Sequence, residues 1–292
     1  MTRIYPYPPS ENKVKWISTD WLQEHFEDYN LMILDVQPSF QDYAQGHISD
    51  AIYMDEKLLR APQRGLPAVY VPPEYIQPIF RRLGLKPDVP VIVYSGVGAV
   101  SKEGDGLAQS MVAYSLVRFG HDNVYVLDGG IDKWKQEGKP LTKIIPAVIA
   151  SDFKVEICKE YFHTYEKFKQ VKDNDDVLLL DVRSPDAYEG RSARGKPGHI
   201  PGAVNLPRAA FFNKENSMLL KFDEEIQAVI EAYGVTPDKT IICSCSTGRT
   251  AISVFILFKW YLRYPKVRIY EGSFSEWASY PENSVVISRN PR

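Results

Sequence analysis

The sequence predicts an α/β protein of two tandem domains, each built on a mainly parallel central sheet flanked by helices. Three observations support this prediction: the length of the chain, an internal repeat, and short apolar runs that alternate with helical patterns. A chain of 292 residues suggests two domains of ordinary size, each with enough residues to form its own core.

The repeat is an ordered series of landmarks that occurs twice. The series consists of an apolar run ending in aspartate, a Gly-His-Ile turn, a second apolar run, and a glycine followed by a tryptophan. It stands at Asp35, 46–48, 91–95 and 129–134 in the first half, and at Asp181, 198–200, 241–245 and 272–277 in the second. Partner landmarks lie about 143 to 152 residues apart. So long a period indicates two copies of a domain rather than a solenoid.

The apolar runs contain no regular polar alternation, which is typical of strands buried on both faces of a parallel sheet. In the second half the expected elements are a helix over 224–233, a strand over 240–244, a helix over 250–262 and a strand over 267–270. Asp223 is expected to cap the first helix and Gly234 to end it. Pro265 is expected to stop the second helix.

The domain boundaries follow from the repeat and from one stretch between its copies. We expect a first domain over 13–141, a linker over 142–156 and a second domain over 157–288. The linker carries Pro146 and few charges, and lies outside both series of landmarks.

Composition excludes several classes of protein. Apolar residues make up 44% and charged residues 25%, as in an ordinary globular protein. The net charge of −2 gives no reason to expect nucleic acid or an anionic membrane as a partner. Residues 1–12 lack the apolar core of a secretion signal, and three cysteines do not make a disulfide framework. We therefore expect a cytoplasmic protein. We also expect no metal or cofactor, since the histidines are scattered along the sequence.

Cys245 is the most informative residue of the chain. It ends an apolar, β-branched run and opens a short loop of small residues before a helical pattern. Backbone N–H groups and the positive end of the following helix favour the thiolate at such a position. The first copy has Ser95 where the second has Cys245. Features shared by both copies are expected to be scaffold, so the first domain is predicted to be catalytically inactive.

The loop after Cys245 is predicted to bind an anion through its N–H groups. Its residues are Ser246, Thr247, Gly248, Arg249 and Thr250. Gly248 permits a backbone conformation closed to most residues, and the hydroxyl groups add further donors.

Other candidates have two interpretations each. Arg249 either binds an anionic donor or is a solvated cation, and the loop position favours the first. Arg183 is a substrate ligand or an ion-pair partner within its domain. Arg191 and Arg194, in a stretch absent from the first half, are substrate ligands or exposed loop charges. Cys243 is expected to be a buried strand residue, and Asp181 and His199 to be structural.

The motifs 181–185, 198–203, 245–251 and 270–277 together resemble the rhodanese family, in particular its tandem-domain thiosulfate and 3-mercaptopyruvate sulfurtransferases. The resemblance covers about residues 16–286. It implies an inactive first domain, an active second domain and a site in the cleft between them. Animal members have an arginine where this chain has Ala187, and Arg191 or Arg194 could replace that cation.

The predicted activity is transfer of a sulfur atom from thiosulfate to cyanide or a thiol through a persulfide on Cys245. The expected partners are these small molecules, with a sulfur-accepting protein as an addition. Three alternatives stay open: 3-mercaptopyruvate as the donor, a sulfur carrier without turnover, and a phosphatase. The last would use Cys243 and Arg249, whose spacing matches that of cysteine phosphatases.

Overall fold

The computed structural model describes residues 3–9, 11–26, 30–192 and 196–291. Contacts divide the chain into two compact units, each of which takes one segment from the other half of the sequence. The first unit comprises Met1–Leu59, Val71–Cys158 and Phe212–Leu220, and the second comprises Arg60–Tyr70, Lys159–Phe211 and Lys221–Arg292. The repeat predicts one domain for each half of the sequence, and it gives no sign of the two exchanged segments.

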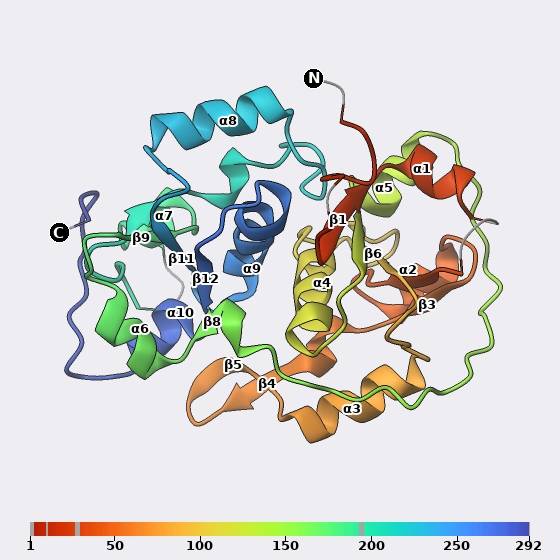
Figure 1. Cartoon of the computed structure of the whole chain (residues 1–292), viewed down its shortest axis with the longest axis horizontal. Helices are drawn as coiled ribbons and strands as arrows, with labels where there is room; N and C mark the ends of the chain where they lie inside the picture. The colour runs from red at the N-terminus through yellow and green to blue at the C-terminus, as the bar shows by residue number, and fades with distance from the viewer. Residues whose placement is uncertain (1–2, 10, 27–29, 193–195, 292) are drawn as a thin grey trace. The chain divides into compact units, whose positions relative to one another are not determined.

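The first unit contains a five-stranded parallel sheet in the order β1-β7-β6-β2-β3. Figure 1 labels three of its strands, β1, β3 and β6. Its strands are β1 (Val14–Ile17), β2 (Met32–Asp35), β3 (Ala51–Tyr53), β6 (Val91–Tyr94) and β7 (Val124–Leu127). Its helices are α1 (Thr19–Glu24), α2 (Phe40–Gln45), α3 (Pro73–Arg82), α4 (Ala108–Arg118) and α5 (Gly130–Gln136), with a 3-10 turn at Glu56–Leu59.

The second unit repeats this plan with a five-stranded parallel sheet in the order β10-β9-β11-β12-β8. Its strands are β8 (Phe162–His163), β9 (Val177–Asp181), β10 (Val204–Asn205), β11 (Thr240–Ser244) and β12 (Val267–Tyr270). Its helices are α6 (Tyr165–Val171), α7 (Pro185–Tyr188), α8 (Asp223–Ala232), α9 (Arg249–Ile256) and α10 (Ser273–Trp277). It also holds the antiparallel hairpin of β4 (Arg60–Gln63) and β5 (Leu66–Tyr70).

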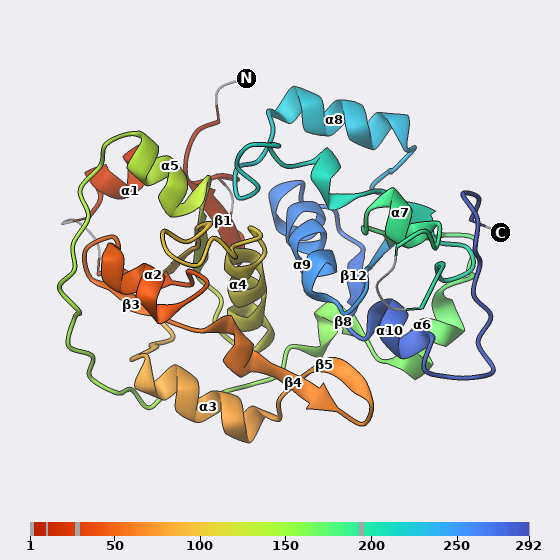
Figure 2. The same ribbon diagram turned by 180° about the vertical axis from the view of Figure 1, so that it is seen from behind.

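Each sheet has helices on both faces, as Figure 2 shows from behind. In the first unit α4 contacts β1, β6 and β7 on one face, and α1 and α5 supply Leu22 and Trp134 to the core on the other. In the second unit α9 contacts β11 and β12, and α6, α7 and α10 supply Phe168, Tyr188 and Trp277 to the opposite core. The α/β fold class predicted from the apolar runs is confirmed.

The expected elements of the second half differ from the observed ones at two places. The strands over 240–244 and 267–270 match β11 and β12, but the helix expected over 250–262 is α9 followed by a π-helix at Leu257–Tyr261. The predicted cap at Asp223 is wrong, because Phe222 holds the cap position of α8. Asp223 is instead the first helical residue, and its carboxylate accepts a hydrogen bond from the hydroxyl of Tyr261.

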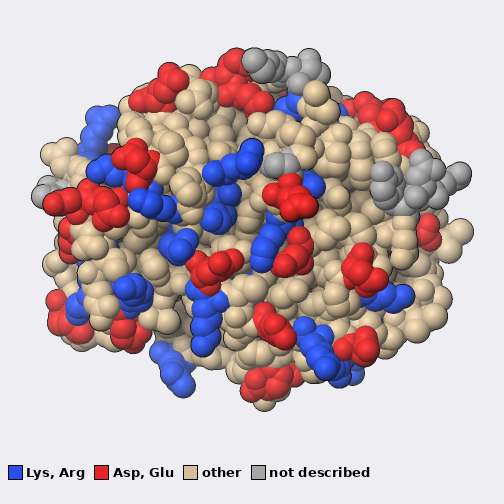
Figure 3. All heavy atoms as spheres, viewed as in Figure 1, with Lys and Arg blue, Asp and Glu red and all other residues tan. Residues whose placement is uncertain are grey.

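Charge is mixed over the face of the protein in Figure 3. Basic and acidic side chains are interspersed on it. Among the described residues, no helix is both long enough and apolar enough to cross a bilayer.

Asp35 is a buried carboxyl at the end of β2. It accepts hydrogen bonds from the backbone N–H of Gln37 at 2.8 Å and from the hydroxyl of Tyr94 at 2.6 Å. Burial raises the pKa of Asp35 to about 6, although the bonds from Tyr94 and Gln37 oppose the shift. Because the unfolded chain has a pKa of about 4 at this residue, folding favours the protonated form.

The direction of this change in pKa predicts how stability depends on pH. The contribution of Asp35 to the free energy of unfolding is greatest below pH 4 and is lost as the pH rises through about 6. Relative to Asp35→Asn, the unchanged protein should gain about 2 kcal/mol in stability between pH 7 and pH 4, because folding raises the pKa of this carboxyl. Urea unfolding of both proteins across this range checks the prediction, and a difference that is independent of pH contradicts it.

Candidate functional site

Cys245 lies directly after β11, which is the central strand of the second sheet. The sulfur is therefore held at the carboxyl ends of parallel strands, where α/β folds bind their ligands. Only 1% of the surface of Cys245 is exposed.

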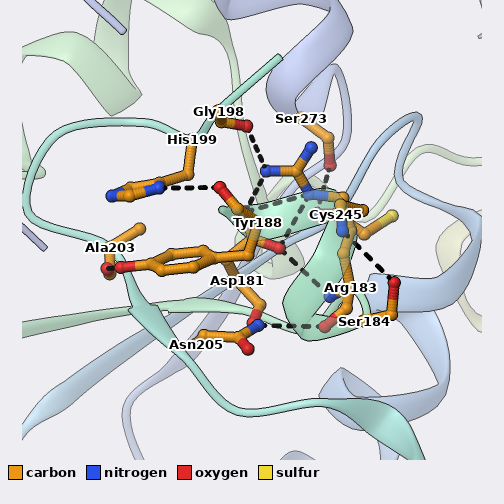
Figure 4. A network of polar contacts seen from close by, with 11 residues as sticks. Asp181, Arg183, Ser184, Tyr188, Gly198, His199, Ala203, Asn205, Cys245 and Ser273 are labelled. Carbon is orange, nitrogen blue, oxygen red and sulfur yellow. Dashed lines mark hydrogen bonds and ion pairs between the residues drawn. The ribbon is translucent and has the colours of Figure 1, made fainter. Parts of the chain in front are cut away.

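Ser273 fixes the backbone at Cys245 (Figure 4). The N–H of Cys245 donates to the hydroxyl of Ser273 at 3.0 Å, and that hydroxyl donates to the carbonyl of Tyr270 at 2.9 Å. Ser273 has a φ of 52°, in the left-handed region, and its counterpart in the first half is Gly130 with a φ of 60°. The sequence analysis did not single out Ser273. The repeat could have indicated it, because Ser273 stands where the first copy has Gly130.

The start of α10 orients the loop that follows the thiol. The carbonyl of Cys245 accepts the N–H of Phe274 at 3.0 Å, and the carbonyl of Ser246 accepts the N–H of Ser275 at 2.9 Å. The C=O and N–H of a trans peptide point in opposite directions. The N–H groups of Ser246 and Thr247 are therefore directed away from α10.

The N–H groups of Ser246, Thr247, Gly248 and Thr250 have no acceptor within the described part of the chain. Gly248 stands just before α9 with a φ of 88°, so the loop turns directly into the N-terminus of that helix. A run of oriented N–H groups next to a helix N-terminus is a site for an anion.

Gly248 is also required by space. A Cβ atom at this position would lie 2.4 Å from the carbonyl oxygen of Glu271. Both the positive φ and this close approach exclude a larger residue without movement of the loop.

The corresponding loop of the first unit binds protein groups instead. The N–H of Ser95 donates to the side chain of Gln109 at 3.1 Å, and the N–H of Val97 donates to the carboxylate of Asp132 at 2.8 Å. The hydroxyl of Ser95 is 3.3 Å from the sulfur of Met218. One bond is common to both units: Ile131 donates its N–H to the carbonyl of Ser95 at 2.9 Å, as Phe274 does to the carbonyl of Cys245.

A second carboxylate, from α2, accepts hydrogen bonds from the far part of the same loop. Asp42 accepts the N–H groups of Val100 and Ser101 at 2.7 and 3.1 Å. The loop of the first unit thus has internal carboxylates at its donors, whereas the loop after Cys245 leaves its donors open within the described residues.

Arg183 is held by groups of its own unit. Its guanidinium donates to the carboxylate of Asp181, with the closest contact at 2.6 Å, and to the carbonyl of Gly198 at 2.9 Å (Figure 4). The guanidinium also lies 4.4 Å from the ring centre of Phe274. In the first unit Gln37 makes the equivalent side-chain bond to Asp35 at 2.8 Å. This geometry favours the ion-pair interpretation of Arg183 over the substrate ligand.

The repeat suggests a graded test of Arg183. Arg183→Met should destabilise the second unit by about 3 kcal/mol or more, because it leaves the buried charge of Asp181 without a partner. Arg183→Gln should cost clearly less, since the amide can donate to Asp181 as Gln37 does to Asp35. Urea unfolding measures both costs. Equal stability of both variants, with a large rise in the KM of the donor, would instead make Arg183 a substrate ligand.

The other arginines predicted for the site lie at different places in the second half of the chain. Arg191 is exposed and pairs with the carboxylates of Asp186, at 2.6 Å, and Glu189. Arg249 is the first residue of α9, at the end of the loop. Arg194 lies outside the described residues.

Cys243 is a different kind of thiol. It lies inside β11, is fully buried, and pairs in register with Leu180 and Ile269. Burial raises the pKa of Cys243 well above its ordinary range, and the neighbouring Cys245 adds to the shift. This environment favours the inert thiol over the nucleophile.

His199 and His47 occupy equivalent structural positions. His199 stacks on Tyr188 with ring centres 3.6 Å apart, and His47 stacks on Tyr43 at 3.8 Å. Their ring nitrogens bond to backbone carbonyls of the same tyrosines at 2.9 Å. In the described ranges, no group of His, Cys, Asp and Glu side chains is arranged to hold a metal ion.

Comparison with known proteins agrees with this geometry. The family model of the rhodanese-like domain matches residues 18–137 and again 164–280. The chain belongs to the rhodanese-like family. The two matches cover the two copies of the repeat, so the family resemblance is confirmed.

Full-length relatives narrow the class of activity. The chain is 32% identical to the sulfur carrier protein TtuD of Thermus thermophilus over 90% of this chain and 93% of that protein. It is 29% identical to the thiosulfate sulfurtransferase of Azotobacter vinelandii, over 90% and 94%. It is 27% identical to the 3-mercaptopyruvate sulfurtransferase of Escherichia coli, over 90% and 95%. These relatives confirm the sulfurtransferase class but leave the donor undecided.

A solved structure supports the fold. The structure of SseA from Escherichia coli, a protein with the rhodanese fold, has a TM-score of 0.76 and 26% identity, and the match covers 89% of this chain and 98% of that one.

Proposed function

We propose that the chain moves a sulfur atom from thiosulfate to a thiol or cyanide, carrying it as a persulfide on Cys245. The observation that supports this proposal best is the set of N–H donors at Ser246, Thr247, Gly248 and Thr250, which follow the sulfur and have no acceptor in the described chain. A persulfide is an anion, and such donors stabilise it without a metal.

The reaction divides into two transfers. In the first, the thiolate of Cys245 attacks the outer sulfur of thiosulfate, a new S–S bond forms, and sulfite leaves with the electron pair of the broken bond. In the second, the acceptor attacks the terminal sulfur of the persulfide, and the electron pair of that S–S bond returns to Cys245. Each transfer leaves one product before the next substrate reacts, so ping-pong kinetics are expected.

Mass spectrometry tests the intermediate directly. After incubation with thiosulfate, a peptide that contains Cys245 should gain about 32 Da. The added mass should disappear when cyanide is supplied. No added mass, or the same mass in a Cys245→Ser protein, would contradict the proposal.

The choice of thiosulfate rests on Arg249, a cation at the end of the loop, and on the absence of an arginine at Ala187. Among the relatives, the Azotobacter protein named for thiosulfate is slightly more similar than the Escherichia protein named for 3-mercaptopyruvate. The kcat/KM of both donors, measured with the same acceptor, decides between them. A large preference for 3-mercaptopyruvate would reverse the choice.

A sulfur carrier without turnover is a second candidate function, favoured by the 32% identity to TtuD. A carrier needs the same persulfide but passes it to a partner protein. Release of sulfite separates the two candidates, because a carrier gives one equivalent per chain and then stops, whereas an enzyme continues with cyanide or dithiothreitol as acceptor.

A further inference from the structure

The hairpin β4–β5 comes from the first half of the sequence but belongs by its contacts to the second unit. Within that unit β5 contacts α10, the helix that follows Ser273 and orients the loop after Cys245. Arg60, the first residue of β4, donates from its guanidinium to the carbonyl of Thr247 at 2.5 Å.

This bond completes a series. The carbonyls of Cys245 and Ser246 are anchored by backbone N–H groups of α10, and the next carbonyl, that of Thr247, is anchored by Arg60. Each anchored carbonyl directs the N–H of the following residue to the opposite side of its peptide. Consecutive N–H groups at 246, 247 and 248 are thereby held in set directions, as an anion nest requires.

The anchor from Arg60 differs from the other two because its donor is a side chain, whereas theirs are backbone N–H groups. Backbone donors keep their place whatever the side chain is, but the anchor at Thr247 depends on one residue. A guanidinium also brings a fixed positive charge to the edge of the loop. That charge and the fixed peptide both favour an anion held by the loop.

We propose that Arg60 is a positioning residue for sulfur transfer, holding the peptide between Thr247 and Gly248 so that the loop is ready to accept the persulfide. The inference rests on the proposed role of Cys245. It assigns to the first half of the sequence a part in the chemistry of the second unit, at a residue that no landmark of the repeat marks.

The test compares Arg60→Met with Arg64→Met. Arg64 is a matched control, because it lies in the same hairpin, at an exposed position of the turn with a φ of 50°. Two rates are measured on each protein: persulfide formation with thiosulfate in a single turnover, and alkylation of Cys245 by iodoacetamide at a fixed pH without any donor. Thermal unfolding is followed in parallel.

Arg60→Met should form the persulfide about 10 to 100 times more slowly, somewhat less than the loss of a direct donor to a reacting anion. Most of the change should be in the rate at saturating donor rather than in KM. Alkylation should also slow, and Arg60→Lys should recover part of both rates. Arg64→Met should match the unchanged protein.

Equal rates in Arg60→Met and Arg64→Met would overturn the inference while leaving the role of Cys245 intact. If Arg60→Met does not fold, Arg60→Lys replaces it in the comparison: slower persulfide formation than in Arg64→Met supports the inference, and equal rates overturn it. Persulfide formation in a Cys245→Ser protein would instead refute the proposed function. The alkylation rate separates the two failures, since it needs no sulfur donor.

Discussion

Replacing Cys245 with serine is expected to lower kcat/KM for sulfur transfer by about 10⁴-fold or more, the range seen when a covalent nucleophile is removed. Serine has nearly the shape of cysteine, so the bond from the N–H at this position to Ser273 should persist. Steady-state release of sulfite from thiosulfate measures the loss. Thermal unfolding should show that the fold is kept.

Cys243→Ala is the control for this experiment. Cys243 is fully buried in β11, two residues before Cys245, and alanine keeps the site apolar. Its replacement should cost stability through a small cavity and leave kcat/KM nearly unchanged. Loss of activity in Cys243→Ala with activity retained in Cys245→Ser would point to the alternative that pairs Cys243 with Arg249.

The duplication explains why only one half is expected to react. Both halves keep the bond from the helix after the glycine landmark to the residue that ends the central strand, at Ser95 and at Cys245. The first half then directs the carboxylate of Asp132 to its own loop, whereas the second half has Ser275 at the matching place and uses its backbone N–H on a carbonyl. A carboxylate inside the loop would repel an incoming anion.

Features that depend on a short stretch of sequence could be predicted from that stretch alone. The apolar runs at 240–244 and 267–270 were sufficient to predict β11 and β12. The thiol before a glycine-containing loop made Cys245 the candidate nucleophile, and that role stays a prediction. The π-helix at Leu257–Tyr261 was not predicted, because its apolar residues continue the pattern of α9 without a break.

Contacts between parts of the chain that are distant in sequence could not be predicted from the sequence. Arg60 and Thr247 are separated by 187 positions, and nothing in the hairpin sequence indicates its partner. Arg183 had two interpretations because a charge beside a strand end shows neither its burial nor its partner. The repeat could have favoured the ion-pair interpretation, since Gln37 stands at the matching place beside Asp35.

Gly248→Ala is expected to damage both the fold and the reaction. The new methyl group would lie 2.4 Å from the carbonyl oxygen of Glu271, and the residue would keep a φ of 88°. The φ alone costs about 1 kcal/mol, and the overlap can be relieved only by moving a backbone group. We expect a total loss of about 2 to 4 kcal/mol in the free energy of unfolding.

Gly234→Ala separates the two costs. Gly234 has a φ of 60° after α8, and nothing lies within 4 Å of the Cβ that would be added there. It should therefore lose only the cost of the backbone conformation, about 1 kcal/mol, and keep its activity. In Gly248→Ala the loop must move to relieve the overlap, so persulfide formation should fall by about 100-fold even where the protein is folded. Urea unfolding and single-turnover assays on both variants check this, and equal losses in the two would show that the loop has room for a side chain at Gly248.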